Sequence, residues 1–182
     1  EDPRDNFAWA GFVGGAGYDV AVGDYGMSAG HLAIDKDRNV YISDQTNSDE
    51  RSFPDGDGFG DLPGPDRSYN GMWDAYVAKI KADGTGLVYA GYIGGADNDE
   101  GKGMAVDDRG AAYLTGNTFS DESSFPVKTG PDLTYNGAQD GFVAKLRPDG
   151  TGLEYCGYFG GDDNDSGQAV ALGPRPEQAL YL

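Results

Sequence analysis

The stretch Trp9-Ala-Gly-Phe-Val-Gly-Gly15 occurs three times in the chain, and its other copies are Tyr89-Ala-Gly-Tyr-Ile-Gly-Gly95 and Tyr155-Cys-Gly-Tyr-Phe-Gly-Gly161. The copies begin at residues 9, 89 and 155, so they return after 80 and then 66 residues. A unit that recurs in this way usually cannot bury its apolar face alone and stacks on copies of itself. The chain is therefore predicted to be a repeat protein whose units form one structure.

Segments around this phrase repeat as well. Ala33-Ile-Asp35 returns as Ala105-Val-Asp107, which is 72 residues later. Asp74-Ala-Tyr-Val-Ala-Lys79 returns as Asp140-Gly-Phe-Val-Ala-Lys145, which is 66 residues later. The unequal spacing shows that the first repeat carries insertions, and insertions are best tolerated in surface loops.

Each repeat has the strand content of one propeller blade. In the second copy, short apolar or strand-like runs cover residues 104–107, 111–118, 141–146 and 153–159. Tight turns or one long polar loop separate these runs, which favours four antiparallel strands. A solenoid of short β coils would need a shorter period. The predicted fold class is all-β, a β-propeller built of four-stranded antiparallel blades.

The repeated pattern also carries a family resemblance. It consists of Gly103-Met-Ala-Val-Asp107, Ala112-Tyr-Leu-Thr-Gly-Asn-Thr118, Ser124-Phe-Pro126, Asp140-Gly-Phe-Val-Ala-Lys-Leu146 and Leu153-Glu-Tyr-Cys-Gly-Tyr-Phe-Gly-Gly161. This pattern resembles the SBBP-type β-propeller repeat of bacterial and archaeal secreted and cell-surface proteins. The resemblance implies a propeller fold and a secreted or cell-surface location, and it implies no set of catalytic residues.

The frame of the repeat predicts the domain organisation within one propeller. Residues 1–29 hold the outer strand of a preceding blade, at 7–13, and an acidic, glycine-rich crossover loop. Residues 30–95 and 102–161 are complete blades, and residues 168–182 are the first two strands of a further, incomplete blade. An array of about three blades falls short of the four to eight that close a ring. We therefore expect other segments or other copies of the chain to complete the propeller.

Charge narrows the range of partners. The chain has 31 acidic and 13 basic residues, a net charge of −18. This balance argues against nucleic acid and anionic membranes, which need Lys and Arg at the contact, and no apolar run is long enough to span a bilayer. A cation is a better partner, although a high negative charge can also serve solubility alone. Cys156 replaces the alanine of the other two copies, which indicates a small buried residue rather than a disulfide.

The acidic residues are predicted to gather on one face, where the long loops and the blade crossovers emerge together. Clustered carboxylates are the ligands that calcium requires, because it takes six to eight oxygens. The candidate calcium ligands are Asp55, Asp57 and Asp61 in the long loop, and Asp97, Asp99, Asp162, Asp163 and Asp165 in the crossovers. The long-loop match is partial, because Phe59 stands where a third acid is usual. The alternative is a solvated acidic turn.

Other repeated or conspicuous residues receive separate predictions. Trp73, Tyr69 and Tyr135 lie in the long loops and could stack on a sugar or a partner. Asp74 and Asp140 precede the third strand, where a carboxylate can accept backbone N–H groups and hold the exit of the long loop. Phe53 and Phe125 belong to repeated Ser-Phe-Pro triplets and are expected to pin each long loop to its blade by burial.

The motifs indicate a protein that is not an enzyme. The turn at Asp149-Gly-Thr-Gly152 resembles the Asp-box turn of sialidases, but it is a turn device there too. A serine hydrolase would have to use His31, and the chain has no Gly-x-Ser-x-Gly motif. We expect an extracellular structural or adhesive interaction module of a larger protein or assembly, whose acidic face binds calcium or a protein partner. A lectin-like, glycan-binding propeller is the alternative, and a propeller enzyme with active residues elsewhere is the third reading.

Overall fold

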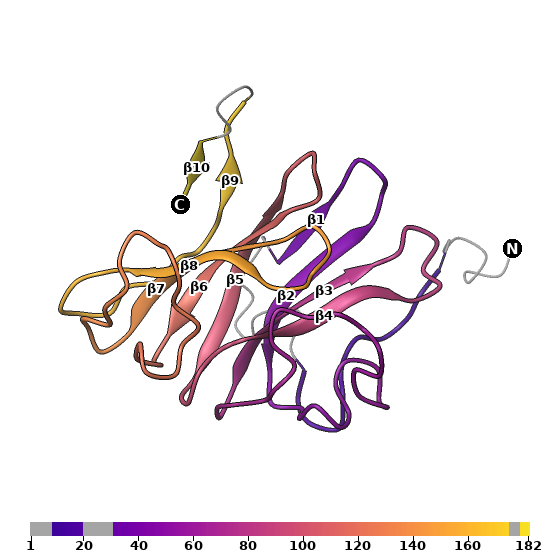
Figure 1. The fold of residues 1–182 in the computed structure, drawn as a ribbon, viewed down its shortest axis with the longest axis horizontal. Coiled ribbons are helices and arrows are strands. Elements are labelled where there is room, and N and C mark those ends of the chain that lie inside the picture. Colours follow the sequence, from indigo (N-terminus) through magenta and orange to yellow (C-terminus); the bar gives the residue numbers. More distant parts are fainter. Residues whose placement is uncertain (1–8, 20–30, 175–178) are drawn as a thin grey trace, which may run out of the picture.

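The computed structural model describes residues 9–19, 31–174 and 179–182, and within these ranges the regular elements are all β-strands. The first sheet consists of β1 (Leu32–Ile34), β2 (Val40–Thr46), β3 (Asp74–Ile80) and β4 (Leu87–Ile93). The second consists of β5 (Asp99–Val106), β6 (Ala112–Thr118), β7 (Asp140–Leu146) and β8 (Leu153–Phe159). Both are antiparallel, with the strands in chain order (Figure 1). The all-β prediction with four-stranded sheets is confirmed.

The two sheets are the same structure built twice. Thr46 pairs with Asp74 in the first sheet, and Thr118 pairs with Asp140 at the matching place in the second. Each sheet also has an irregularity near the end of its third strand, between Lys79 and Ile80 in the first. The turn that follows contains Gly84, whose φ of 69° lies in the left-handed region that favours glycine. Repeated turn chemistry thus fixes repeated register.

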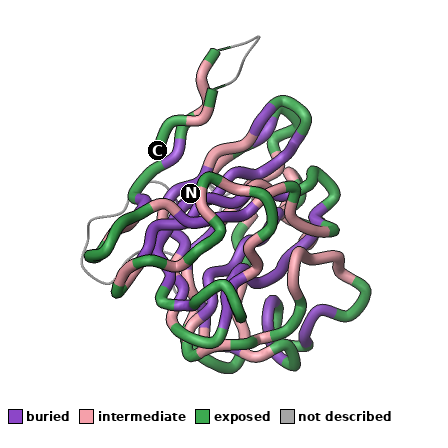
Figure 2. Tube along the Cα trace, turned by 60° about the vertical axis from the view of Figure 1, so that its left-hand side comes forward, coloured by how far each residue is buried: buried purple, intermediate pink, exposed green. Residues whose placement is uncertain are grey.

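A shared core holds the sheets together. It contains Tyr41, Val77 and Tyr89 from the first sheet, which pack with Leu114 and Phe142 from the second. β2 and β1 lie against β5, and the buried segments of the tube run through the interior while the loops are exposed (Figure 2). Burying this apolar surface against the neighbouring sheet is the main favourable contribution to stacking.

Cys156 takes part in this core. It is fully buried, has no disulfide partner, and lies among the residues that join the two sheets. Burial raises the pKa of its thiol to about 12. A neutral, inaccessible thiol of this kind acts as a small apolar side chain.

The crossover between the sheets is shorter than the sequence indicated. β5 begins at Asp99, ahead of residue 102, where we expected the second blade to start. The Asp99 N–H donates a hydrogen bond of 2.8 Å to the Trp73 carbonyl, and Asp99 pairs with Thr118 across the sheet. These long-range contacts extend the strand into the acidic crossover. A register shift between Gly101 and Gly103 then restores the repeat.

The two ends of the chain form no complete sheet among the described residues. Residues 9–13 contain no strand, although they repeat the sequence of β4 and β8. Residues 7 and 8 of that expected strand, and most of the crossover loop to residue 29, lie outside the described residues. At the other end, β9 (Ala171–Leu172) and β10 (Leu180–Tyr181) pair antiparallel, as the first two strands of a blade do.

No helix in the described ranges is long and apolar enough to cross a membrane. The described sheets form an open, curved row in which the second sheet follows the first (Figure 1).

Candidate functional site

A hydrogen-bonded aspartate joins the first sheet to the second. Asp99 is fully buried. Its Oδ2 accepts hydrogen bonds from the Gly95 N–H at 2.7 Å and from Ser120 Oγ at 3.0 Å, and its Oδ1 accepts one from Thr118 Oγ1. Gly95 ends the outer strand of one blade, whereas Thr118 and Ser120 end the second strand of the next. We call this set of contacts the junction lock.

The same lock occurs ahead of the first sheet. Asp19 accepts hydrogen bonds from the Gly15 N–H at 2.8 Å, from Ser48 Oγ at 3.1 Å and from Thr46 Oγ1. After the second sheet only half of the lock is formed. Asp165 accepts the Gly161 N–H at 2.7 Å, and no side-chain hydroxyl within the described ranges donates to it. The repeated phrase therefore ends, at each junction, on a glycine that binds the crossover aspartate.

Replacing Asp99 with Ala is expected to lower the free energy of unfolding by about 2 kcal/mol, because two buried hydroxyls and one buried N–H lose their acceptor. Urea denaturation measures the change. Asp162→Ala is the matched control, because Asp162 is an exposed aspartate of the next crossover, and it is expected to cost less than about 0.5 kcal/mol. Equal losses in the two variants would show that the lock contributes nothing specific.

Asp74 and Asp140 lie beside the locks and hold the exits of the long loops. Asp74 Oδ2 accepts the Asn70 N–H at 3.0 Å, and Asp140 Oδ2 accepts the Asn136 N–H at 2.9 Å. In each case Oδ1 is buried and no donor reaches it with hydrogen-bond geometry. A Cβ built on Gly94 would meet both Asp74 Oδ1, at 2.6 Å, and Asp99 Oδ2, at 2.9 Å. Two carboxylates therefore flank one glycine.

This arrangement shifts the titration of Asp74. Burial raises the pKa of Asp74 to about 7, and the charge of Asp99 adds to the effect, while the N–H groups of Asn70 and Gly71 oppose it. Burial likewise raises the pKa of Asp140, with a further contribution from Asp165. The pairing of strand-entry and crossover aspartates was missed by sequence reasoning. The signal for it was that both aspartates recur in register with the glycines.

The predicted calcium ligands are not brought together. Asp55, Asp57 and Asp61 are exposed, and Phe59 between them is buried against Phe53 and Tyr92. The loop is thus anchored by an aromatic ring. In the crossovers, Asp97, Asp162 and Asp163 are exposed, whereas Asp99 and Asp165 are engaged in locks. Over the part of the chain that the structure describes, no three His, Cys, Asp or Glu residues are grouped as a metal site.

The predicted stacking residues pack within the loops. Tyr69 donates its hydroxyl hydrogen to the Met72 carbonyl, and its ring centroid lies 5.9 Å from that of Tyr92. Tyr135 donates to the Ala138 carbonyl at 2.7 Å, and its ring lies 5.8 Å from that of Tyr158. The half-buried ring of Trp73 lies 6.5 Å from the Tyr18 ring. Each tyrosine therefore closes its own long loop onto the outer strand of its blade.

Phe53 and Phe125 are both buried under the long loops. Phe53 lies in a cluster with Phe59, Tyr76 and Tyr92 on the first sheet. Phe125 lies in the core between the two sheets, with its ring 5.3 Å from Phe142 and 5.4 Å from Tyr158.

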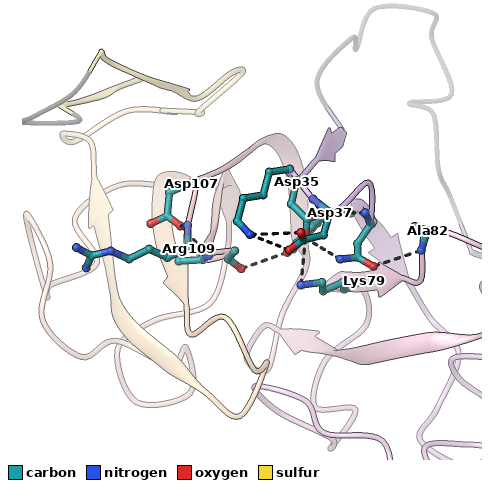
Figure 3. Close-up of polar contacts among 11 residues, drawn as sticks. Asp35, Asp37, Lys79, Ala82, Asp107 and Arg109 are labelled. Atoms are coloured by element: carbon teal, nitrogen blue, oxygen red, sulfur yellow. Dashed lines mark hydrogen bonds and ion pairs between the residues drawn. The ribbon is translucent and has the colours of Figure 1, made fainter.

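A second polar network joins the sheets at the opposite end, where the hairpin turns lie. Tyr41 donates its hydroxyl hydrogen to Asp35 Oδ2 at 3.0 Å, and its oxygen lies 3.2 Å from the Gly110 carbonyl oxygen of the next sheet. Lys79 Nζ lies 3.3 Å from Asp35 Oδ2 (Figure 3). Burial alone would raise the pKa of Asp35, but hydrogen bonds from Asn39, Tyr41 and Lys79 outweigh it and lower the pKa to about 2.

His31 forms a buried pair with Asp44 at the start of the first sheet. His31 Nδ1 lies 3.4 Å from Asp44 Oδ2 and 3.0 Å from the Ser43 carbonyl oxygen. Asp44 is fully buried within β2, and burial raises its pKa to about 7.

The two ends of the sheets differ in charge. We call the end with the long loops and crossovers (residues 47–73, 94–98, 119–139 and 160–164) the loop face, and the end with the hairpin turns (35–39, 81–86, 107–111 and 147–152) the turn face. The exposed acids of the loop face are Glu50, Asp55, Asp57, Asp61, Asp97, Asp121, Glu122, Asp162 and Asp163. On the turn face acids and bases alternate, as in the Lys36–Asp37 ion pair of 3.1 Å.

The basic side chains of the loop face do not balance its charge outward. Arg67 donates to the Gly60 carbonyl at 2.7 Å, and Lys128 donates to the Leu153 carbonyl at 2.8 Å. Both cations are thus directed at the chain's own backbone. The loop face presents an excess of unpaired carboxylates to solvent.

The fold and its junctions define a class of protein: stacked four-stranded antiparallel sheets of the kind found in propeller blades. Comparison with protein families agrees. Residues 88–121 match the family model of the SBBP beta-propeller repeat, and the resemblance stated from the sequence is confirmed for this stretch. It runs from β4 through β6 and contains the complete lock at Asp99. No protein with curated annotation matches the chain.

Proposed function

We propose that this chain is a noncatalytic structural and adhesive module of a propeller, within a secreted or cell-surface protein, and that its loop face is the interaction surface. The family match supports the propeller module. The charge separation between the two faces is the observation that carries the proposal.

The loop face suits a basic partner. Nine exposed acids lie on the long loops and crossovers, where sequence length also varies most between the two blades. A one-sided negative potential attracts a cationic protein segment and orients it during encounter. The contacts are exposed, so the attraction is expected to weaken as salt shortens the range of the field.

Binding of a ten-residue oligolysine peptide tests this function. The loop-face variant Asp55→Asn/Asp57→Asn/Asp61→Asn is expected to weaken binding at low salt by about fivefold, because three charges of the attracting surface are removed. The turn-face variant Asp37→Asn/Asp83→Asn/Asp149→Asn removes the same charge and is expected to weaken binding by less than about twofold. Fluorescence anisotropy measures both. Equal weakening would mean that only the net charge matters and would contradict the proposal.

A calcium arm belongs to the same experiment, since calcium is the cofactor expected from the sequence. Calcium at about 1 mM covers the affinity of extracellular calcium modules. If the loop binds calcium, the melting temperature of the native protein rises and that of the Asp55→Asn/Asp57→Asn/Asp61→Asn variant does not.

A further inference from the structure

A cavity of about 560 Å³ opens at the junction ahead of the first sheet. Gly14, Gly15, Gly17, Tyr18 and Asp19 line it, and Phe12 lies at its edge with its side chain fully exposed. These residues come from the first copy of the repeated phrase and from the crossover that follows it. We call this cavity the junction slot.

The second junction shows what fills the equivalent space. There the counterparts of Gly15 and Asp19 are Gly95 and Asp99, and residues 70–74 cover them. Asp99 N–H donates to the Trp73 carbonyl at 2.8 Å, and Trp73 forms a parallel bridge with Asn98. Gly71 packs so closely that a Cβ on it would lie 2.7 Å from the Gly95 carbonyl oxygen.

The third junction repeats the same filling. Residues 136–140 cover the crossover, and the Asp165 N–H donates to the Gln139 carbonyl at 2.8 Å. A Cβ on Gly137 would lie 2.8 Å from the Gly161 carbonyl oxygen and 2.3 Å from the Asp163 carbonyl oxygen. In both junctions the filling segment reads Tyr-Asn-Gly-x-x-Asp and leads directly into the third strand of its blade.

The aromatic residue of the phrase gives an independent sign of the missing contact. Tyr92 and Tyr158 are fully buried, and each packs against the tyrosine of its filling segment, Tyr69 or Tyr135. Phe12 holds the same position in the first copy and is fully exposed. Exposure of a large ring whose two counterparts are buried indicates a surface that a partner covers.

We propose that the junction slot is a docking site for the strand-entry segment of a further repeat unit, with the sequence Tyr-Asn-Gly-x-x-Asp followed by a β-strand. The segment's glycine passes over the carbonyls of Gly15 and Gly17, its main-chain carbonyl accepts the Asp19 N–H, and its strand pairs with residues 9–13. This is strand addition to an open edge.

The occupant is a further repeat unit and not another copy of residues 9–182. Both segments of this type within the described ranges fill slots of their own sheet, through Trp73 and Gln139. A copy in the same conformation has none to donate. The slot lies on the edge of the blade array and shares only Asp55 with the acids proposed for the loop face, so the inference goes beyond the proposed function.

A synthetic peptide of residues 135–147 is the probe, because it carries Tyr135-Asn-Gly-Ala-Gln-Asp140 and the strand of β7. Labelled peptide is titrated into the native protein, and fluorescence anisotropy is expected to show saturable binding. Phe12→Ala in the protein is expected to weaken binding about tenfold, since the ring loses its contact with the peptide's tyrosine. Phe119→Ala, which removes another exposed ring outside the slot, is the matched control and is expected to leave binding unchanged.

The peptide carrying Gly137→Val is expected not to bind, because its side chain meets the carbonyls of the slot. Equal binding of the two peptides, or equal effects of Phe12→Ala and Phe119→Ala, overturns the proposal. If light scattering shows that the native protein dimerises and that Phe12→Ala abolishes the dimer, the occupant is a second copy, and the proposal is again overturned.

A fusion gives a second measurement that does not depend on peptide affinity. Residues 99–152 joined in front of residue 7 supply three strands and the filling segment for the first copy of the phrase. The melting temperature is expected to rise relative to the same fusion carrying Gly137→Val within the added segment. No rise contradicts the proposal, whereas the oligolysine experiment is unaffected by either result. Failure of the slot and failure of the loop face are therefore distinguishable.

Discussion

Raising the pH from 4 to 8 is expected to lower the free energy of unfolding by about 4 kcal/mol. The cause is a set of buried carboxyl groups. Burial raises the pKa of Asp74 to about 7, of Asp44 to about 7 and of Asp99 to about 6, against a model value of 3.8. Each of these groups loses its proton at higher pH in the folded protein than in the unfolded chain.

The sign follows from proton binding. Between pH 4 and 7 the folded state holds protons that the unfolded state has released, so stability falls as the pH rises through the folded pKa. Asp35 acts in the opposite direction, because its folded pKa of about 2 makes it lose stability only as the pH falls below 4. Stability is therefore expected to be greatest near pH 4 to 5. Urea denaturation at a series of pH values measures the profile.

Asp74→Asn separates the contribution of the junction from that of net charge. The amide keeps an oxygen for the Asn70 N–H and places a donor at Oδ1, a position close to the Gly95 and Asp97 carbonyls, which share the surroundings of Gly71 with it. This variant is expected to be more stable than the native protein at pH 8 and to depend less on pH. Asp162→Asn removes the same charge from an exposed position and serves as the control. A pH profile unchanged by Asp74→Asn would contradict the explanation.

Replacing Phe125 with Ala is expected to lower the free energy of unfolding by about 4 kcal/mol, as large-to-small changes of buried aromatic residues do. Phe125 is buried between the two sheets and contacts Phe142 and Tyr158. Its backbone N–H is bonded to the Asp121 carbonyl at 2.8 Å. The ring therefore pins the long loop and also contributes to the core that joins the blades.

Phe119→Ala is the matched control, because Phe119 is the exposed phenylalanine at the start of the same loop. It is expected to cost less than about 1 kcal/mol. Thermal unfolding measures stability, and limited proteolysis of residues 119–139 reports on the loop. If both variants lose the same stability, Phe125 does not anchor the loop.

The junctions connect stability with the proposed function. Lock, filling segment and loop anchor all meet where the repeated phrase ends, at Gly95 and Asp99 in the complete case. The same place supports the loop face above it. Changes to buried junction residues are therefore expected to act on binding through folding, whereas changes to Asp55 or Asp162 act on charge alone.

Much of the fold could be predicted from the sequence because its signals are local. Alternating apolar residues and glycine turns indicated the strands within each blade, and the equal spacing of Asp74 and Asp140 indicated that the blades match in register. The SBBP resemblance rested on the same features. These signals determine how each strand forms and which strand follows which.

The candidate site could be predicted only in part. Sequence reasoning grouped Asp99 with Asp97 and the aspartates of the next crossover as calcium ligands, because all of them lie in Asp-Asn-Asp segments. The structure buries Asp99 and leaves Asp97 exposed. The difference depends on Thr118 and Ser120, which are distant in sequence and reach Asp99 only after the blades stack.

The sequence by itself determined the repeat, the four strands of each blade and the acidic composition of the loops. Only the tertiary structure decided which aspartates are buried and whether the repeated phrase becomes a strand. Trp9-Ala-Gly-Phe-Val and Tyr89-Ala-Gly-Tyr-Ile are nearly the same sequence, yet only the second is a strand. The physical reason is that β4 has β3 beside it to satisfy its backbone hydrogen bonds, whereas residues 9–13 have no third strand among the described residues.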